Sequence, residues 1–279
     1  MSEIIESTVL RTEVEVDGAP ASYLTVERDG PAVLLLHGTY WSRVWLPVLG
    51  RLGAAGLRPV AVDLPGLGRS GGELTLETGT VPALADWVTR FASTLGLDGP
   101  IAVAGHDIGG AVAQHLLVHD RLAVSRLALV NSVTYDSWPV SSVARFRDPE
   151  AVAATTADEL LTARRRAVTQ ALAGAATERR ITEYLSPWTD ARVRRSWMAM
   201  VGAADNRYTR DAVPALRRNA TPKLLVWGED DDFQQVTYAE RFAAEIPHTT
   251  LVRVPDAGHI PTENAPGPVA RALADFCTA

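Results

Sequence analysis

The pattern of hydrophobic and polar positions divides most of the chain into short apolar runs and longer amphipathic segments. Residues 7–27 alternate between polar and apolar side chains around Asp17-Gly18, which predicts an antiparallel hairpin. Six further apolar runs have the length of buried strands. These runs are residues 32–36, 59–62, 101–104, 127–130, 223–227 and 250–254. The segments with helical periodicity are residues 45–53, 84–95, 108–119, 238–245 and 268–276. This alternation is typical of a parallel sheet with helices on both faces.

Residues 135–219 break the alternation, because they contain no convincing strand. Their periodicity predicts three helices, at 157–172, 178–185 and 191–203. We therefore expect a core domain formed by residues 1–134 and 220–279, with residues 135–219 as an all-helical cap. In open α/β sheets ligands bind beyond the carboxyl ends of the strands, so the cap is expected to cover that edge. We interpret the arginines of the cap as a solvated helix face. They include Arg164, Arg165, Arg166, Arg192, Arg194 and Arg195.

Composition narrows the class of protein. Hydrophobic residues make up 47% of the chain and charged residues 22%, as in ordinary globular proteins. The formal net charge of −6 argues against a nucleic-acid partner. Cys277 is the only cysteine, which excludes an internal disulfide and a multi-cysteine metal site. Residues 1–16 lack the apolar centre of a signal peptide, and no run of 18 apolar residues occurs. We expect a cytoplasmic protein without a membrane partner; a homodimer is left open.

The segment Gly105-His106-Asp107-Ile108-Gly109-Gly110 joins a predicted strand to a predicted helix. Glycines flank Asp107 on both sides, as a sharp and strained strand-to-helix turn requires. Such a turn lifts the side chain of residue 107 clear of the sheet and directs the following backbone N–H groups at a ligand. The hexapeptide taken alone also fits an ordinary turn with an N-capping aspartate.

Three other motifs follow strands of the same predicted sheet. They are His37-Gly38, the segment Asp63 to Ser70, and Ala257-Gly258-His259. In this order, and together with the turn at Asp107, they resemble the α/β-hydrolase family over nearly the whole chain. The resemblance implies an α/β-hydrolase fold, in which a mostly parallel eight-stranded sheet is flanked by helices and carries an all-helical cap.

The resemblance also implies a catalytic triad in the chain order nucleophile, acid, histidine. Asp107 takes the position of the nucleophile. Of the six histidines, only His259 follows the last predicted strand. The acid is expected in the loop after residues 223–227, where the family pattern places an apolar residue two positions beyond it. That pattern selects Asp231, because Phe233 follows it.

Two details of this assignment stay open in the sequence. Asp230 and Asp232 are the alternative acids, since both lie in the same loop as Asp231. Some relatives carry the acid after the preceding strand, but here that position is Asn131-Ser132, without a carboxylate. The resemblance further implies an oxyanion hole formed by the backbone amides of Thr39 and Ile108.

An aspartate nucleophile changes the expected reaction. A carboxylate is ionised at neutral pH without a base, and its attack on a saturated carbon gives a stable alkyl ester. His259 can then activate the water that hydrolyses this ester. In this respect the chain resembles the epoxide hydrolases and the haloalkane dehalogenases, and the chemistry needs no cofactor and no metal ion.

The leaving group separates these two activities. An epoxide needs a proton donor, which cap tyrosines supply in epoxide hydrolases, and the cap contains Tyr184 and Tyr208. Haloalkane dehalogenases mostly have a tryptophan directly after the nucleophile, where this chain has Ile108. Tyr40 in turn replaces a proline that epoxide hydrolases share. We expect an epoxide hydrolase for a small, largely apolar substrate, with Tyr184, Tyr208, Trp41 and Trp138 as substrate-binding residues. The alternatives are a haloalkane-type dehalogenase, a cofactor-independent lyase or cyclase, and a non-catalytic binding protein.

Overall fold

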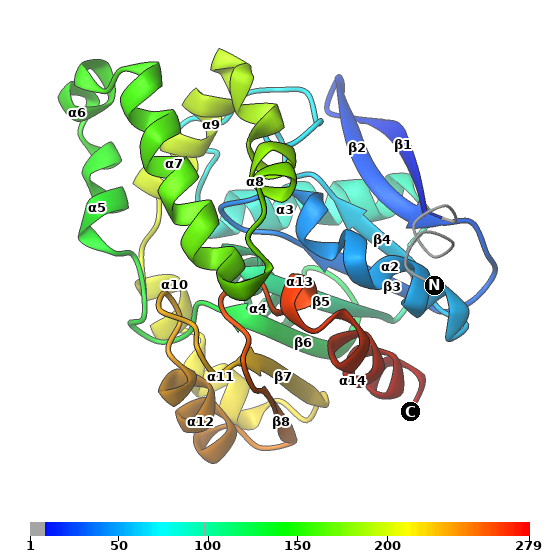
Figure 1. The fold of residues 1–279 in the computed structure, drawn as a ribbon. Helices are drawn as coiled ribbons and strands as arrows, with labels where there is room; N and C mark the ends of the chain where they lie inside the picture. The colour runs from blue at the N-terminus through cyan, green and yellow to red at the C-terminus, as the bar shows by residue number, and fades with distance from the viewer. Residues whose placement is uncertain (1–8, 98) are drawn as a thin grey trace.

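The structure, a computed structural model, describes residues 9–97 and 99–279. Residues 1–8 lie outside the described residues. They include residues 7–8 of the predicted hairpin and the first half of the segment, residues 1–16, in which we expect no signal peptide. An eight-stranded sheet runs through the centre of the molecule (Figure 1). Its strands are β1 (Val9–Val16), β2 (Ala19–Val26), β3 (Ala32–Leu36), β4 (Arg58–Val62), β5 (Ile101–Asp107), β6 (Val124–Ser132), β7 (Lys223–Gly228) and β8 (Thr249–Val254).

The strand order in the sheet is β1-β2-β4-β3-β5-β6-β7-β8. Strand β2 pairs antiparallel with both β1 and β4, and all other neighbours are parallel. The predicted mostly parallel, eight-stranded α/β-hydrolase sheet is therefore confirmed. Crossovers connect the parallel strands, as they must when both strands run in the same direction.

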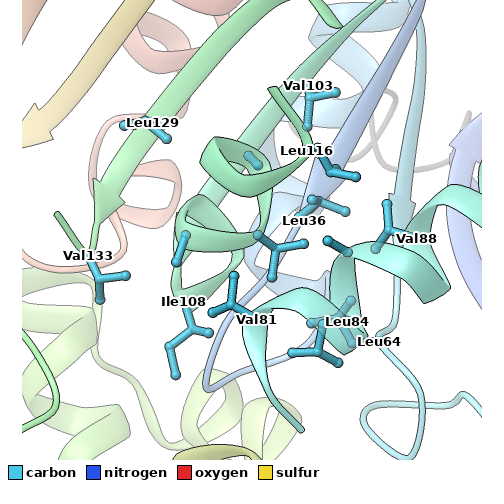
Figure 2. Packing of buried hydrophobic residues seen from close by; sticks show 14 of the residues in the cluster. Leu36, Leu64, Val81, Leu84, Val88, Val103, Ile108, Leu116, Leu129 and Val133 are labelled. Atoms are coloured by element: carbon cyan, nitrogen blue, oxygen red, sulfur yellow. The ribbon is translucent and has the colours of Figure 1, made fainter. Parts of the chain in front are cut away.

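Helices cover both faces of the sheet. The helices associated with it are η1 (Ser42–Trp45), α2 (Leu46–Ala54), α3 (Val81–Thr94), α4 (Ile108–Val118), α12 (Val236–Glu245), α13 (Pro261–Asn264) and α14 (Pro266–Thr278). Successive residues of each strand face opposite layers, so Leu34 and Leu36 belong to a different apolar cluster from Val33 and Leu35. The first cluster includes residues of α3 and α4, whose packing on the sheet Figure 2 shows. The second cluster includes residues of α2 and α14.

The chain between β6 and β7 is helical. It contains α5 (Ser141–Ala144), η2 (Arg145–Arg147), α6 (Pro149–Ala154), α7 (Ala157–Leu172), η3 (Ala173–Ala175), α8 (Glu178–Leu185), η4 (Ser186–Thr189), α9 (Ala191–Gly202), α10 (Arg207–Arg210) and α11 (Val213–Arg218). Helices α7, α8 and α9 match the three predicted helices, whereas the shorter ones lack enough turns to show a periodicity. The domain boundaries at residues 134 and 220 stay a prediction. Among the described residues, no helix is long and apolar enough to cross a membrane.

The register of the sheet determines which loops meet at its carboxyl edge. Leu36 of β3 pairs with Gly105 of β5, so the loop that begins at His37 lies beside the turn at Asp107. On the other side, Asp107 pairs with Ser132 at the end of β6. Strand β7 pairs in parallel with β6, which brings its own following loop to the same edge. Polar residues at or after the carboxyl ends of four neighbouring strands, β3, β5, β6 and β7, thus come together.

Candidate active site

Asp107 occupies the strained turn that the flanking glycines predict. It is the last residue of β5 and directly precedes α4, and its backbone has φ 55° and ψ −129°. A positive φ is unfavourable for an L-residue with a Cβ atom, so the surrounding packing has to enforce it. Gly109 allows this packing, because a Cβ at that position would lie 2.5 Å from the Leu36 carbonyl oxygen. The Asp107 side chain is only 6% exposed and borders a cavity.

Thr39 holds one oxygen of the Asp107 carboxylate. Its backbone N–H donates to Asp107 Oδ2 over 2.9 Å, and its hydroxyl donates to the same oxygen over 2.6 Å. Gly38 allows this approach, since a Cβ there would lie 2.8 Å from Oδ2 and would collide with the Ile108 nitrogen. The backbone amides of Thr39 and Ile108, which we predicted to form an oxyanion hole, therefore both lie near Gly38, beside Asp107.

His259 and Asp231 form the second half of the site. The His259 Nδ1–H donates to Asp231 Oδ2 over 2.8 Å. The other oxygen, Oδ1, accepts from the backbone N–H groups of Phe233 and Gln234 at 2.7 and 3.0 Å. With its Nδ1 used in this way, a neutral His259 keeps Nε2 unprotonated. His259 also lines the cavity that Asp107 borders.

The other carboxylates of the Asp231 loop are placed differently. Asp230 is exposed, and Asp232 is exposed and accepts from the Gln170 side chain at 2.9 Å. Asp231 is buried. The geometry thus supports the sequence-based choice of Asp231 over its neighbours.

Burial and neighbouring charges act in opposite directions on the buried pair. Burial alone would lower the pKa of His259, but the Asp231 carboxylate, its hydrogen bond and Asp107 outweigh it and raise that pKa above the ordinary value. For Asp231, burial opposes ionisation, but His259 and the hydrogen bonds lower the pKa below the ordinary value. The pair is therefore stabilised as carboxylate and imidazolium when no substrate is bound.

His106 lies against this pair but differs in character. Its ring centroid is 4.8 Å from that of His259, and its Nε2–H donates to the His259 carbonyl oxygen over 2.8 Å. Burial, with a further contribution from the charge of His259, lowers the pKa of His106 to about 4. His106 is thus a neutral residue that holds the backbone of the His259 loop.

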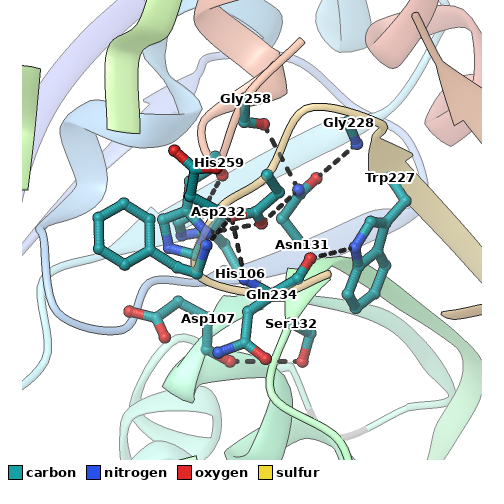
Figure 3. Close-up of polar contacts among 12 residues, drawn as sticks. His106, Asp107, Asn131, Ser132, Trp227, Gly228, Asp232, Gln234, Gly258 and His259 are labelled. Carbon is teal, nitrogen blue, oxygen red and sulfur yellow. Dashed lines mark hydrogen bonds and ion pairs between the residues drawn. The ribbon is translucent and has the colours of Figure 1, made fainter. Parts of the chain in front are cut away.

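Asn131 supports Asp231 and was not assigned a role from the sequence. At the end of β6 its side-chain amide donates to Asp231 Oδ2 over 2.6 Å, and its carbonyl oxygen accepts from the Gly228 N–H over 3.0 Å. Figure 3 shows it between Gly228 and Gly258. The signal that could have found it is its place directly after a buried parallel strand, at the edge where ligands bind.

A cavity of about 150 Å³ adjoins Asp107. Most of its wall is apolar, and the polar groups are few. The lining residues are Thr39, Tyr40, Asp107, Ile108, Val133, Trp138, Pro139, Val140, Ser142, Val143, Arg164, Ala167, Trp197, Val201, Ala204, Phe233, Gln234 and His259. A small apolar pocket with convergent polar groups is the usual form of a binding site for a small molecule.

Three of the four predicted substrate-binding residues are absent from this lining. The Tyr184 hydroxyl donates to Glu263 Oε1 over 3.0 Å instead, and the Trp41 indole N–H donates to the Tyr184 carbonyl oxygen over 3.2 Å. Tyr208 is half-buried and is not among the lining residues either. Trp138 does line the cavity, but its N–H donates to the Thr209 hydroxyl over 2.8 Å. Tyr184, Tyr208 and Trp41 therefore lie outside the lining of this cavity, and their contact with a substrate stays a prediction.

The position of Arg164 differs from the expectation that the arginines of the cap form a solvated face. Arg165 and Arg166 are exposed, but Arg164 is only 6% exposed and lines the cavity. Its position could have been predicted, because Leu160 and Val168, four residues before and after it, mark the buried face of α7. Tyr40 was likewise noted only as a departure from a motif, yet it lines the cavity.

The sequence model of the alpha/beta hydrolase family matches residues 33–272. That range includes every element of the site. The chain belongs to the α/β-hydrolase family. It is an enzyme of that family, a hydrolase whose substrate the fold alone does not determine.

The relatives of this hydrolase include haloalkane dehalogenases and an epoxide hydrolase. Haloalkane dehalogenase 2 of Mycobacterium tuberculosis is 30% identical over 260 residues, which cover 88% of each chain. Bifunctional epoxide hydrolase 2 of Sus scrofa is 31% identical over 114 residues, 40% of this chain and 20% of the relative. Among solved structures, an α/β-hydrolase fold protein from Burkholderia ambifaria has a TM-score of 0.82 at 25% identity, covering 95% of this chain and 97% of its own.

Proposed function

We propose that this hydrolase breaks the bond between a saturated carbon and its leaving group through an alkyl ester on Asp107. The observation that carries the proposal is the placement of a carboxylate, not a hydroxyl, on the strained turn, with His259, held by Asp231, lining the same cavity. The Asp107 carboxylate would attack the carbon, and the leaving group would depart with the bonding electrons. Because Thr39 holds Oδ2, we assign the attack to Oδ1.

Hydrolysis of the ester would use the second half of the site. His259 Nε2 takes a proton from water, and the resulting hydroxide attacks the ester carbonyl carbon of Asp107. The amides of Thr39 and Ile108 stabilise the oxyanion that forms. The ester bond then breaks, and the departing alkoxide takes up the proton from His259 to become the alcohol. The proton of the attacking hydroxyl leaves to solvent as Asp107 returns to a carboxylate. Asp231 holds the imidazole in the required tautomer throughout.

A halide is the leaving group that the cavity supports best. It departs as a stable anion and needs no proton, whereas the Tyr184 hydroxyl is engaged with Glu263. The relative that covers 88% of the chain is named as a haloalkane dehalogenase. We further propose a small and largely apolar substrate, since the cavity of about 150 Å³ has a mostly apolar wall.

Epoxide opening is the second candidate, and one observation favours it. Tyr40 is one of the residues that line the cavity. Burial raises the pKa of Tyr40 well above its ordinary value, which keeps the phenol protonated and able to donate to a forming alkoxide.

The test is to trap the ester. His259→Gln should block ester hydrolysis but leave alkylation intact, so intact-protein mass spectrometry after exposure to alkyl bromides and epoxides should show one adduct per chain. Peptide mapping should place it on Asp107, and its mass identifies the substrate class, because an epoxide adds a hydroxyalkyl group and a bromide adds an alkyl group. His248→Gln, at an exposed histidine, is the matched control and should turn over without an adduct. Undiminished turnover by Asp107→Ala would refute the proposal.

A further inference from the structure

Arg164 places a buried guanidinium at the wall of the cavity. Its carbon Cζ lies 5.2 Å from the ring centroid of Tyr40 and 4.7 Å from those of Trp188 and Trp197. One nitrogen, Nη2, donates to the Thr39 carbonyl oxygen over 3.0 Å, while the buried Nε–H has no hydrogen-bond partner among the described residues. The aromatic rings stabilise the cation, and the Tyr40 side chain accepts a hydrogen bond from it.

Arg43 is also deeply buried, but unlike Arg164 it is paired with carboxylates. Arg43 is 8% exposed and binds two carboxylates, Glu263 at 2.6 Å and Glu183 at 3.0 Å. Within residues 9–97 and 99–279, no carboxylate oxygen lies within 4.0 Å of the Arg164 guanidinium nitrogens. A buried charge without a paired carboxylate is costly, and a cost of this kind in a cavity points to a function.

Asp107 is the charge of the cavity that opposes Arg164. Burial lowers the pKa of Arg164, whereas Tyr40 and then the charge of Asp107 oppose this and favour the guanidinium cation. In the proposed reaction, alkylation neutralises Asp107, and the leaving group carries the negative charge away. At that moment Arg164 loses its opposing charge, and a new anion appears in the same small cavity.

We propose that the Arg164 guanidinium is the binding site for the departing halide. This inference rests on the proposed function, since it assigns a residue to its first step. The negative charge passes from Asp107 to the halide while the cation beside both remains fixed, so the charge of the cavity does not change during the displacement. A substrate carboxylate on Arg164 would instead place a third carboxylate next to Asp107 and Asp231, which two cations cannot balance.

Halide binding tests the proposal without turnover. Asp107→Asn imitates the neutral, alkylated state, so bromide should bind this variant about tenfold more tightly than the native enzyme, the change expected when one neighbouring charge is removed. Titration calorimetry at constant ionic strength measures the affinity, and the fluorescence of Trp188 and Trp197 reports on the same site. In the Asp107→Asn background, Arg164→Met should abolish saturable binding. Arg166→Met, on the exposed side of the same helix, should preserve it.

Each result bears on the proposal. Equal bromide affinity in native and Asp107→Asn enzyme, bromide binding that survives Arg164→Met, or acetate binding more tightly than bromide would overturn it; the last would indicate a substrate carboxylate. If Arg164→Met does not fold, Arg164→Lys should still bind bromide, more weakly than arginine does. The adduct experiment separates the two proposals, because it reports on Asp107 alone. If the adduct forms but bromide binding does not depend on Arg164, only the halide site is refuted. If bromide binding depends on Arg164 but no adduct forms, only the alkyl ester is refuted.

Discussion

At the scale of single residues, His259 determines how the proposed reaction depends on pH. Its pKa is raised because Asp231, their hydrogen bond and Asp107 together outweigh the effect of burial. The imidazole has to be neutral to accept a proton from water. Alkylation removes the charge of Asp107, and with it one of the contributions that raise the pKa. The ester form of the enzyme therefore holds a more readily deprotonated His259 than the resting form does.

We expect the rate of ester hydrolysis to rise with pH and to level off above the pKa of His259. The sign follows from the direction of the shift, because a base whose pKa is raised is neutral only above that higher value. Single-turnover decay of the alkyl-enzyme, followed by rapid quench and mass spectrometry between about pH 5 and pH 9, measures this profile. Histidine proton NMR on the resting enzyme should give the higher of the two pKa values. A hydrolysis rate that falls with rising pH would contradict the assignment of His259 as base.

The residues of the site differ in how far the sequence could predict them. Asp107, Asp231 and His259 lie at or after the ends of predicted strands, so the order of the strands in the sheet is enough to place them close together. Tyr184 and Tyr208 lie on helices, where the direction of a side chain depends on how each helix packs. The periodicity of α7 does place Arg164 on a buried face, but whether that face meets apolar core or the cavity depends on Trp197 of α9, which lies far along the chain.

At the scale of elements, the turn between β5 and α4 depends on close packing against β3. Gly109 stands where a Cβ would lie 2.5 Å from the Leu36 carbonyl oxygen and 2.6 Å from that of His37. Both partners are backbone atoms, one in the last residue of β3 and one at the start of the loop after it, and they cannot move aside as a flexible side chain could. Because residue 109 is a glycine, α4 can pack close to β3. This close packing allows the helix to begin directly after Asp107.

Gly109→Ala should lower the free energy of unfolding by about 1–3 kcal/mol, as overpacking of a rigid interior does. It should also displace Asp107 and reduce adduct formation. Urea denaturation and the adduct assay measure the two effects. Gly267→Ala is the matched control, since Gly267 lies in α14 with nothing within 4 Å of a Cβ. An equal loss of stability in both variants would mean that the added methyl group does not act through its contact with β3.

At the scale of the whole molecule, a buried polar network joins the helical segment to the sheet. Arg43, in η1, binds Glu183 of α8 and Glu263 of α13. Tyr184 of α8 donates to the same Glu263, and Arg180 lies 3.3 Å from its second oxygen. Tyr184, predicted to contact the substrate, is thereby one of the residues that hold α8 in place.

Glu263→Ala should lower the free energy of unfolding by about 3–5 kcal/mol, because it leaves Arg43 buried with one carboxylate fewer. Tyr184→Phe removes a single hydrogen bond and should cost about 1 kcal/mol without slowing alkylation. Glu240→Ala breaks an exposed ion pair with Arg253 and should cost less than about 1 kcal/mol. Urea denaturation of the three variants gives the order. A loss for Glu263→Ala no larger than that for Glu240→Ala would show that the network does not stabilise the protein.

Thr39 has a consequence for building chimeric enzymes. Its amide and hydroxyl hold Asp107, while its carbonyl oxygen accepts from Arg164 of α7 and from Trp197 of α9. A graft that exchanges residues 135–219 for those of a homologue therefore changes more than the wall of the cavity. It also removes two anchors of the loop that positions the carboxylate, so a donor segment has to bring its own arginine and tryptophan, or the recipient loop has to be redesigned with it.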